Sequence, residues 1–264
     1  MKPVVLVTEA KSILSKASGF IDAFDYTLNP YRGCVFGCSY CYAKFSFSNN
    51  RSQQEWGQWV EVKRNAVELL HKKRDLQHAR IYMSSVTDPY QPVEREFRLT
   101  RGLLEALLPH QPRLVIQTRS PLVSRDGDLL AQFEHCRVHM TVGTDDDAIR
   151  RDFEPGCASV EQRLEALSKL RSAGVETAVT ATPLLPLRDP LSFSRRLRSL
   201  GVGRLVVQFF HAGNAGWGAA RTGSEAWTTA QIYGWDSAAY LQAVEALRSE
   251  WPDLLEGQAG FIPV

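Results

Sequence analysis

The sequence predicts an α/β fold, a partial (β/α)6 barrel of the TIM type built on a parallel sheet. Short runs rich in β-branched and aromatic residues alternate with longer stretches of helical periodicity, which is typical of strands joined by crossover helices. The length of 264 residues suits one such domain. We find no linker, low-complexity tract or internal repeat that would mark a second domain.

The first strand is expected to begin near Tyr26 and to end before Asn29, where the chain leaves the sheet through Asn29-Pro30. Five further strands and six helical stretches follow in alternation, and right-handed crossovers make the strands parallel. The predicted strands are 79–83, 113–118, 137–142, 175–181 and 204–210, and the helical stretches are 63–74, 98–109, 126–135, 159–173, 190–200 and 237–251.

These elements divide the chain into three parts. Residues 1–25 form an extended, irregular lead-in that we expect to cover one end of the sheet, 26–210 form the barrel core, and 211–264 form a loop and a closing helix packed on the same domain. Residues 45–59 are polar and aromatic and predict a surface excursion. The Gly- and Trp-rich stretch 211–235 is long for a connection, which favours a lid or a substrate wall; its tryptophans either stack a planar substrate or belong to the core, namely Trp217, Trp227 and Trp235.

Charge and targeting signals are weak. The net charge of +2 gives no overall electrostatic attraction to nucleic acid. The first apolar run is too short for a signal peptide, and no stretch reaches the length of a membrane span. Five cysteines, an odd number with three clustered, fit a reducing compartment better than a disulfide framework. We therefore expect a cytoplasmic monomer with no membrane partner.

Three cysteines stand close together as Cys34-x3-Cys38-x2-Cys41, a density that indicates a metal site. A closed zinc site needs a fourth ligand, and the next His or Cys along the chain is His71. Three thiolates on a four-iron cluster leave one iron without a protein ligand, and open coordination positions are typical of catalytic metal sites.

The motif, with Tyr40 directly before the third cysteine, resembles the signature of radical S-adenosylmethionine (SAM) enzymes. The stretches 29–34 (NPYRGC) and 87–94 (TDPYQPVE) are similar to the spore photoproduct lyase-like branch, and the resemblance spans about residues 25–190. It implies that the three cysteines hold a [4Fe-4S] cluster whose free iron binds SAM. One electron from the reduced cluster then cleaves SAM to methionine and a 5'-deoxyadenosyl radical, which takes hydrogen from a substrate. It also implies an external electron donor such as flavodoxin or ferredoxin.

Polar residues follow each predicted strand, at the end where barrels of this kind carry their active sites. A guanidinium at Arg119 suits a carboxylate, and the resemblance implies that it holds the carboxylate of SAM. The same resemblance suggests Ser85 or Thr87 for the amino group, Thr141 or Thr144 for the ribose, and Tyr40 against the adenine.

For the substrate, we expect Asp88 and Tyr90 to face the site, although the two prolines of their stretch also fit a simple rigid turn. Cys157 is a candidate hydrogen-atom donor or further redox ligand, with an inert small residue as the alternative. His211 follows a strand and serves either the reaction or the structure. Cys136 is expected to close an apolar helix in the core.

The substrate itself is left open. Spore photoproduct lyase has a cysteine just before its Thr-Asp step, whereas this chain has Ser85-Val86-Thr87-Asp88. We therefore expect a small molecule or a peptide as substrate. A nucleic-acid repair or modification enzyme of the same chemistry is the first alternative, with a basic patch at Arg195, Arg196, Arg198 and Arg204. A non-catalytic metal-binding module, which predicts zinc and no cluster, is the second.

Overall fold

The computed structural model describes residues 2–47, 53–73, 75–211 and 222–264. Its main sheet contains the six predicted strands, all parallel to one another, and confirms the α/β class. These strands are β3 (Tyr26–Leu28), β6 (Arg80–Met83), β7 (Arg113–Thr118), β8 (Cys136–Thr141), β9 (Glu176–Ala181) and β10 (Arg204–Val207).

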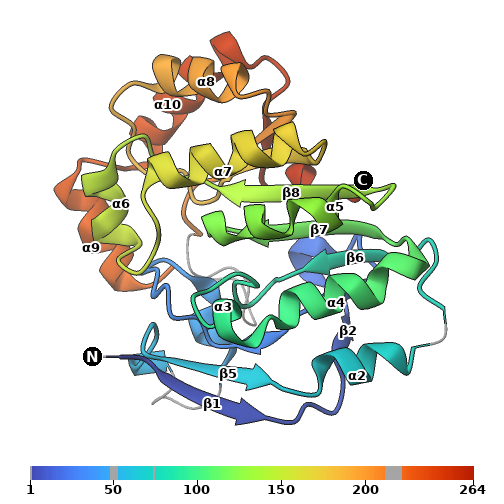
Figure 1. Cartoon of the computed structure of the whole chain (residues 1–264). Coiled ribbons are helices and arrows are strands. Elements are labelled where there is room, and N and C mark those ends of the chain that lie inside the picture. The colour runs from blue at the N-terminus through green and yellow to red at the C-terminus, as the bar shows by residue number, and fades with distance from the viewer. Residues whose placement is uncertain (1, 48–52, 74, 212–221) are drawn as a thin grey trace.

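Two short strands complete this sheet at its edges. β11 (Leu255–Glu256) runs parallel to β10, and β2 (Leu14–Lys16) runs antiparallel to β3. The order is β11-β10-β9-β8-β7-β6-β3-β2, and the two edge strands are not paired with each other, so the barrel is open (Figure 1).

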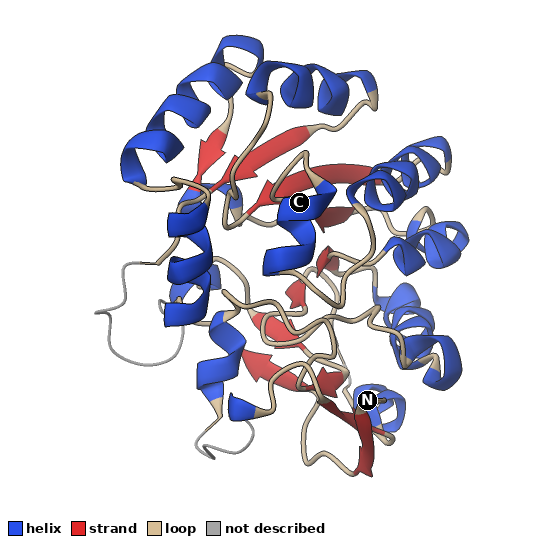
Figure 2. Cartoon of the chain, turned by 90° about the vertical axis from the view of Figure 1, so that its left-hand side faces the viewer, coloured by secondary structure: helices blue, strands red, loops and turns tan. Residues whose placement is uncertain are grey.

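Helices follow the outside of the open barrel, as seen from the end at which the parallel strands finish (Figure 2). The predicted stretch 126–135 is helical only in part, because α5 is a single turn that continues a 3-10 helix over Pro121–Asp126. The helices near predicted positions are α2 (Ala66–His71), α4 (Leu99–Leu107), α5 (Gly127–Leu130), α7 (Val160–Ser172), α8 (Pro190–Ser199) and α10 (Ser237–Glu250). The helices that the sequence pattern did not predict are α3 (Glu94–Phe97), α6 (Asp147–Phe153) and α9 (Ser224–Ile232).

A second, three-stranded sheet lies beside the barrel. β5 (Trp59–Lys63) is its central strand, with β1 (Val4–Thr8) parallel on one side and β4 (Tyr31–Arg32) antiparallel on the other. The prediction of an excursion up to residue 59 followed by a helix from Lys63 was wrong for 59–63, because Trp59, Val60 and Val62 are buried strand residues. This sheet matters for the site because the cysteine loop starts immediately after β4.

The central strands are buried on both faces. On β7, Leu114 and Ile116 belong to the core under the helices, whereas Val115 belongs to a smaller core inside the barrel with Tyr82 and Phe261. Burial of both faces explains why apolar residues stand next to one another on this strand instead of alternating with polar ones. Cys136 is buried as expected, but it begins β8 rather than closing a helix. Within the described residues, none of the helices is both long enough and apolar enough to cross a membrane.

Candidate active site

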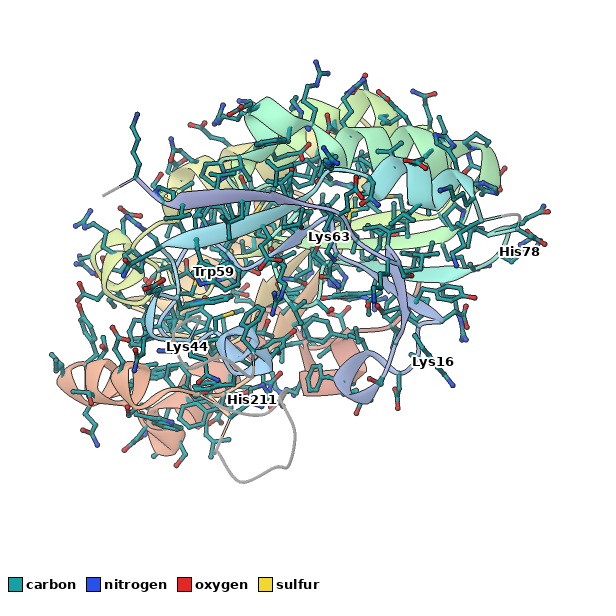
Figure 3. All side chains as sticks on the ribbon, turned by 90° about the horizontal axis from the view of Figure 1, so that it is seen from below. Lys16, Lys44, Trp59, Lys63, His78 and His211 are labelled. Atoms are coloured by element: carbon teal, nitrogen blue, oxygen red, sulfur yellow. The ribbon has the colours of Figure 1, made fainter. Side chains whose placement is uncertain are left out.

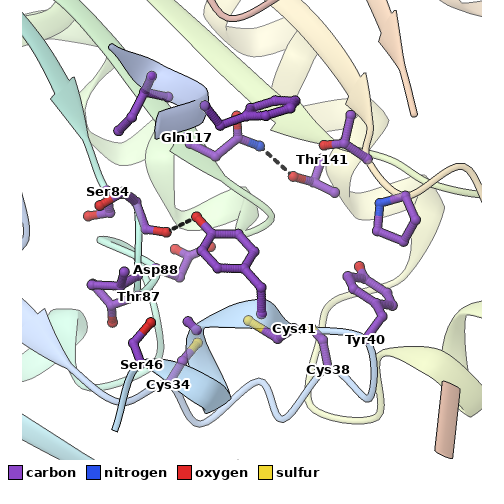
Figure 4. A pocket seen from close by; sticks show the side chains of 18 of the residues that line it. Cys34, Cys38, Tyr40, Cys41, Ser46, Ser84, Thr87, Asp88, Gln117 and Thr141 are labelled. Carbon is purple, nitrogen blue, oxygen red and sulfur yellow. Dashed lines mark hydrogen bonds between the residues drawn. The ribbon is translucent and has the colours of Figure 1, made fainter. Parts of the chain in front are cut away.

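A cavity of about 360 Å³ opens at the carboxyl ends of the parallel strands. Figure 4 shows the cysteine loop along one side of it, with Gln117 and Thr141 on the other. The side chains that line it come from the cysteine loop and from the carboxyl ends of the six predicted strands or the segments just after them. They include Cys34, Cys38, Tyr40, Cys41, Ser85, Thr87, Asp88, Gln117, Arg119, Thr141, Thr182, Gln208 and His211.

Two glycines give the cysteine loop its path. Gly33 has φ +76°, and a Cβ built there would lie 2.7 Å from the Trp59 ring. Gly37 has φ +62°, and its Cβ would lie 3.2 Å from the Cα of Gly57. Both positions therefore combine a left-handed backbone with close contact to the 56–59 segment, which only glycine tolerates without strain.

The three thiols of the loop fit a cluster better than a single ion. All three are free and line the cavity. Nevertheless, among the described residues no three His, Cys, Asp or Glu side chains are placed to hold one metal ion. A four-iron cluster gives each thiolate its own iron and so spreads its ligands around a larger body, consistent with three cysteines around a cavity.

The thiols differ in their electrostatics. Burial raises the pKa of Cys41 to about 11, and burial also raises the pKa of Cys34, with Asp88 adding to the effect. Burial acts in the same direction on Cys38, but the Cys157 thiol and the charge of Arg119 outweigh it and lower the pKa of Cys38 below its ordinary value. Cys38 is therefore the thiol that most readily becomes the thiolate a metal requires.

Arg119 lies directly against the cysteine loop. Its Nη1 is 2.8 Å from the Sγ of Cys38, donates to the hydroxyl of Tyr40 over 2.7 Å, and lies 3.4 Å from a carboxylate oxygen of Glu154. Among the described residues, the Arg119 side chain makes its hydrogen bonds through Nη1. The rest of the guanidinium fork is therefore left for a ligand in the cavity.

Glu154 and Arg163 form the layer beneath Arg119. The Glu154 carboxylate accepts from the Tyr40 hydroxyl and from Nη2 of Arg163 over 2.5 Å, and both side chains are 1% exposed. Arg163 in turn donates to the backbone carbonyls of Thr141 and Ala158. The pair is thus a fully buried ion pair anchored to the backbone. Sequence reasoning missed both residues, and no motif or spacing distinguishes them from other charged residues.

Asp88 organises the segment after β6. Its carboxylate accepts from the backbone N–H of Tyr90 (2.8 Å), the hydroxyl of Thr118 (2.8 Å) and the backbone N–H of Arg119 (2.9 Å). Burial raises its pKa, although these donors oppose the shift. Asp88 lines the cavity as expected, and most of its hydrogen-bonding capacity holds the two strand ends together.

Ser85 and Thr87 lie on the cavity wall near the cysteine loop. The backbone N–H of Ser85 donates to the side-chain oxygen of Asn29 over 2.9 Å, and its carbonyl accepts from the Tyr42 hydroxyl. Thr87 donates to the carbonyl of Gly33 over 2.6 Å. Both residues therefore tie the segment after β6 to the loop that carries the cysteines.

Gln117 connects the walls opposite the cysteines. Its amide nitrogen donates to Thr141 (2.6 Å) and Thr180 (2.8 Å), and its oxygen accepts from the Tyr82 hydroxyl (3.0 Å). Residues from four adjacent strands thus share one polar network beside the cavity.

Three predicted site residues do not line the cavity. Tyr90 is fully buried behind it, and the Arg125 guanidinium lies 5.9 Å from its ring, so the expectation that it faces the substrate does not hold. Thr144 is buried and donates to the carbonyl of Pro186 over 2.6 Å. Cys157 is buried with its Sγ 3.8 Å from the Sγ of Cys38, so it meets the cysteine loop rather than the cavity.

His211 lines the cavity, with its ring within 3.2 Å of the Gln208 amide nitrogen, and burial lowers its pKa. In Figure 3 it lies at the same end of the molecule as Lys44, whereas His78 lies at the opposite end. Trp227 packs against Phe209 and Phe210, and Trp235 is buried, so these two tryptophans belong to the core. Trp217 lies outside the described residues.

The family model described as the radical SAM superfamily matches residues 28–190. The chain therefore belongs to the radical SAM superfamily of enzymes, whose cofactors are a [4Fe-4S] cluster and SAM.

Among curated proteins, the chain is 37% identical over 161 residues to an uncharacterised protein of Methanocaldococcus jannaschii, a match covering 61% of each chain. It is 29% identical to an uncharacterised protein of Mycobacterium tuberculosis, over 62% of this chain and 50% of that one. It is 26% identical to a radical SAM Nα-GlyT isomerase of Pseudomonas phage M6, over 70% of this chain and 39% of that one. The chain thus matches the first two of these relatives over only about half to three fifths of their own length.

Among solved structures, spore photoproduct lyase superposes with a TM-score of 0.62 at 14% identity, covering 96% of this chain and 81% of that one. Streptococcus suis SuiB bound to its precursor peptide superposes with a TM-score of 0.53 at 11% identity, covering 96% and 51%. At such identities the likeness concerns the fold, and it confirms the open α/β architecture.

Proposed function

We propose that this protein reductively cleaves SAM and uses the resulting radical to take a hydrogen atom from a small-molecule or peptide substrate held in the cavity. The observation that carries the proposal is the convergence of Cys34, Cys38 and Cys41 with Arg119 on one cavity. When bound, the cluster and SAM supply the 5'-deoxyadenosyl radical. The work of the chain is then to bind, orient and exclude water and oxygen.

The residues around the cavity suit the parts of SAM. Arg119 has guanidinium N–H groups free of the contacts made by Nη1, and these can pair with the methionine carboxylate. We assign Ser85 or Thr87 to the amino group and Thr141 to the ribose because all three line the cavity, whereas Thr144 does not line it and donates to Pro186. Tyr40 is held by Arg119 and Glu154 at the cavity wall, a position from which its ring can lie against the adenine.

The substrate proposal rests on the charges of the cavity. Lys16, Arg119 and Asp88 are its fully charged lining residues, so a row of cations for phosphates is absent from the described wall. Three arginines of the predicted basic patch pair with carboxylates: Arg195 with Glu250, Arg196 with Glu161 and Arg198 with Asp253. The fourth, Arg204, lies on β10 rather than on the same helix, and burial lowers its pKa. Asp88 and His211 are the wall residues we assign to the substrate. Cys157, behind Cys38, is not placed to donate hydrogen to it.

A nucleic-acid substrate is the second candidate, favoured by one observation. A structure of spore photoproduct lyase, which shares the fold, holds a dinucleoside spore photoproduct. Binding of single- and double-stranded oligonucleotides, measured at two salt concentrations, separates the candidates. Binding of low affinity that disappears at the higher salt supports the small-molecule or peptide proposal.

The proposal is tested by reconstituting the protein anaerobically with iron and sulfide and adding SAM and dithionite. We expect a brown protein with about four irons per chain and release of 5'-deoxyadenosine. The substitution Cys38→Ala should abolish both, whereas Cys136→Ala, a buried cysteine of β8 outside the cavity, should preserve both. A zinc protein that never cleaves SAM would contradict the proposal and favour a metal-binding module. In the cell we expect a cytoplasmic monomer that takes its electron from flavodoxin or ferredoxin.

A further inference from the structure

Cys38 is set apart from the other two cysteines of the loop by its neighbours. Nη1 of Arg119 lies 2.8 Å from its Sγ, and the Cys157 thiol lies 3.8 Å away. No hydrogen bond from a side chain to the Sγ of Cys34 or Cys41 is found among the described residues. One sulfur of the three therefore receives a cationic donor and also contacts a second thiol.

The position of Arg119 is fixed from behind. The Glu154 carboxylate binds the same Nη1 and the Tyr40 hydroxyl, and it is itself held by the fully buried Arg163. The backbone around Glu154 is also anchored, because Nη1 of Arg150 donates to the carbonyls of Glu154 (3.2 Å) and Cys157 (3.0 Å). The result is one continuous chain of contacts, Cys38–Arg119–Glu154–Arg163, that ends on the backbone of β8.

Hydrogen bonds and charge near a ligand sulfur are among the means by which proteins set the reduction potential of an iron–sulfur cluster. A donor to the sulfur stabilises the more negative, reduced cluster, and a nearby carboxylate opposes it. The Arg119–Glu154 pair places both effects beside the same thiolate. Stability of the fold alone does not explain the Arg119–Glu154 pair, because a buried ion pair is seldom a net source of stability.

Resting on the proposed function, we propose that the Arg119–Glu154 pair sets the potential at which the cluster accepts its electron: the contact of Arg119 with Cys38 raises this potential, and the charge of Glu154, which also holds Arg119 in place, lowers it. Arg119 then has two tasks. Nη1 donates to the cluster ligand, and the rest of the fork binds the carboxylate of SAM. Binding of SAM and reduction of the cluster thereby share one side chain.

The test is the reduction potential of the reconstituted cluster, measured by an anaerobic titration followed by electron paramagnetic resonance, without SAM and without substrate. Arg119→Met removes the donor and the charge, and we expect the potential to fall. Glu154→Gln removes the opposing charge but keeps a hydrogen-bonding side chain, and we expect the potential to rise. Each substitution should shift the reduction potential by at least about 59 mV, which corresponds to a tenfold change in the equilibrium constant for one-electron reduction.

Glu94→Gln is the matched control. Glu94 is also fully buried and also binds a tyrosine and an arginine, namely Tyr31 and Arg125, but it does not line the cavity. Its substitution should leave the potential unchanged. Glu154→Asp should return the potential toward the wild-type value.

The outcomes are distinct. If the wild-type chain assembles no cluster, the proposed function fails. If it does, and Arg119→Met and Glu154→Gln both leave the potential unchanged, this inference is overturned while the proposed function stands. If Glu154→Gln does not fold, Arg119→Met alone decides, and an unchanged potential there counts equally against the inference.

Discussion

The carboxylate of Asp88 accepts the backbone N–H of Arg119 over 2.9 Å, joining the segment after β6 to the end of β7. The same carboxylate accepts from Tyr90 and Thr118, so one buried side chain satisfies three donors. Asp88 was expected to face the substrate, and its contacts give it a structural task in addition.

Replacing Asp88 with alanine should therefore destabilise the fold. Three donors lose their acceptor, and we expect the free energy of unfolding to fall by about 2–3 kcal/mol. Urea unfolding followed by circular dichroism measures this. Asp75→Ala removes an exposed carboxylate that accepts the N–H of Gln77, and its effect should be below about 0.5 kcal/mol. Equal effects of the two substitutions would contradict the account.

Gly33→Ala should disturb the cysteine loop. The left-handed backbone costs about 1–2 kcal/mol for alanine, and the new Cβ would meet the Trp59 ring at 2.7 Å. We expect a larger loss of stability than for Gly234→Ala, where φ is +61° but nothing lies within 4 Å of the added Cβ. We also expect less iron per chain after reconstitution in the Gly33 variant alone. Full iron loading there would show that the loop tolerates the shift.

Substitution of Thr141 and of Thr144 should affect the affinity for SAM differently. Thr141→Val removes a hydroxyl from the cavity wall, and loss of one hydrogen bond should weaken SAM binding by about tenfold. Thr144→Val alters a hydroxyl that donates to Pro186 outside the cavity, and SAM affinity should be unchanged. Calorimetry on the cluster-loaded protein compares them. If the Thr144 variant binds SAM more weakly than the Thr141 variant, the ribose assignment is wrong.

His139 should make stability depend on pH. Burial, with help from Arg137 and Arg204, lowers its pKa from 6.5 to about 3, and both ring nitrogens are without a hydrogen-bond partner among the described residues. Between pH 6.5 and about pH 3, the imidazole of His139 therefore binds a proton in the unfolded chain but not in the folded chain. The stability that the folded protein gains from a neutral His139 is fully present above pH 6.5 and is lost as the pH falls toward 3.

The measurement is the difference in unfolding free energy between wild type and His139→Leu from pH 8 to pH 5. Below pH 6.5 the wild type should lose stability relative to the variant, approaching about 1.4 kcal/mol per pH unit for one proton. A constant difference for the His139 variant would mean that the buried imidazole does not titrate with unfolding.

Local patterns were sufficient for the six parallel strands, because burial of both faces leaves short apolar runs such as Leu114, Val115 and Ile116. They were also sufficient for the cysteine motif. The strand at 59–63 was missed because it joins a small separate sheet, and its pairing partners at 4–8 and 31–32 are distant in sequence. Tertiary pairing there overrides what the local composition suggests.

Side-chain directions at the site were harder to predict. Tyr90 shares a motif with Asp88, yet Asp88 accepts its N–H in a tight turn and its ring enters the core. Glu154 reaches Arg119 across 35 positions, and Cys157 reaches Cys38 across 119. Contacts between such distant positions depend on how helices α6 and α7 pack over the sheet, and spacing within a single sequence does not contain that information.

The 114 positions between Tyr40 and Glu154 also bear on how the protein is made. Translation delivers the three cysteines first and the groups that enclose them much later, since synthesis proceeds at about 5–20 residues per second. The nascent chain thus carries reactive thiols on a loop whose supporting wall has not yet been synthesised. Iron insertion into the finished protein, after release from the ribosome, is the order of events that this arrangement favours.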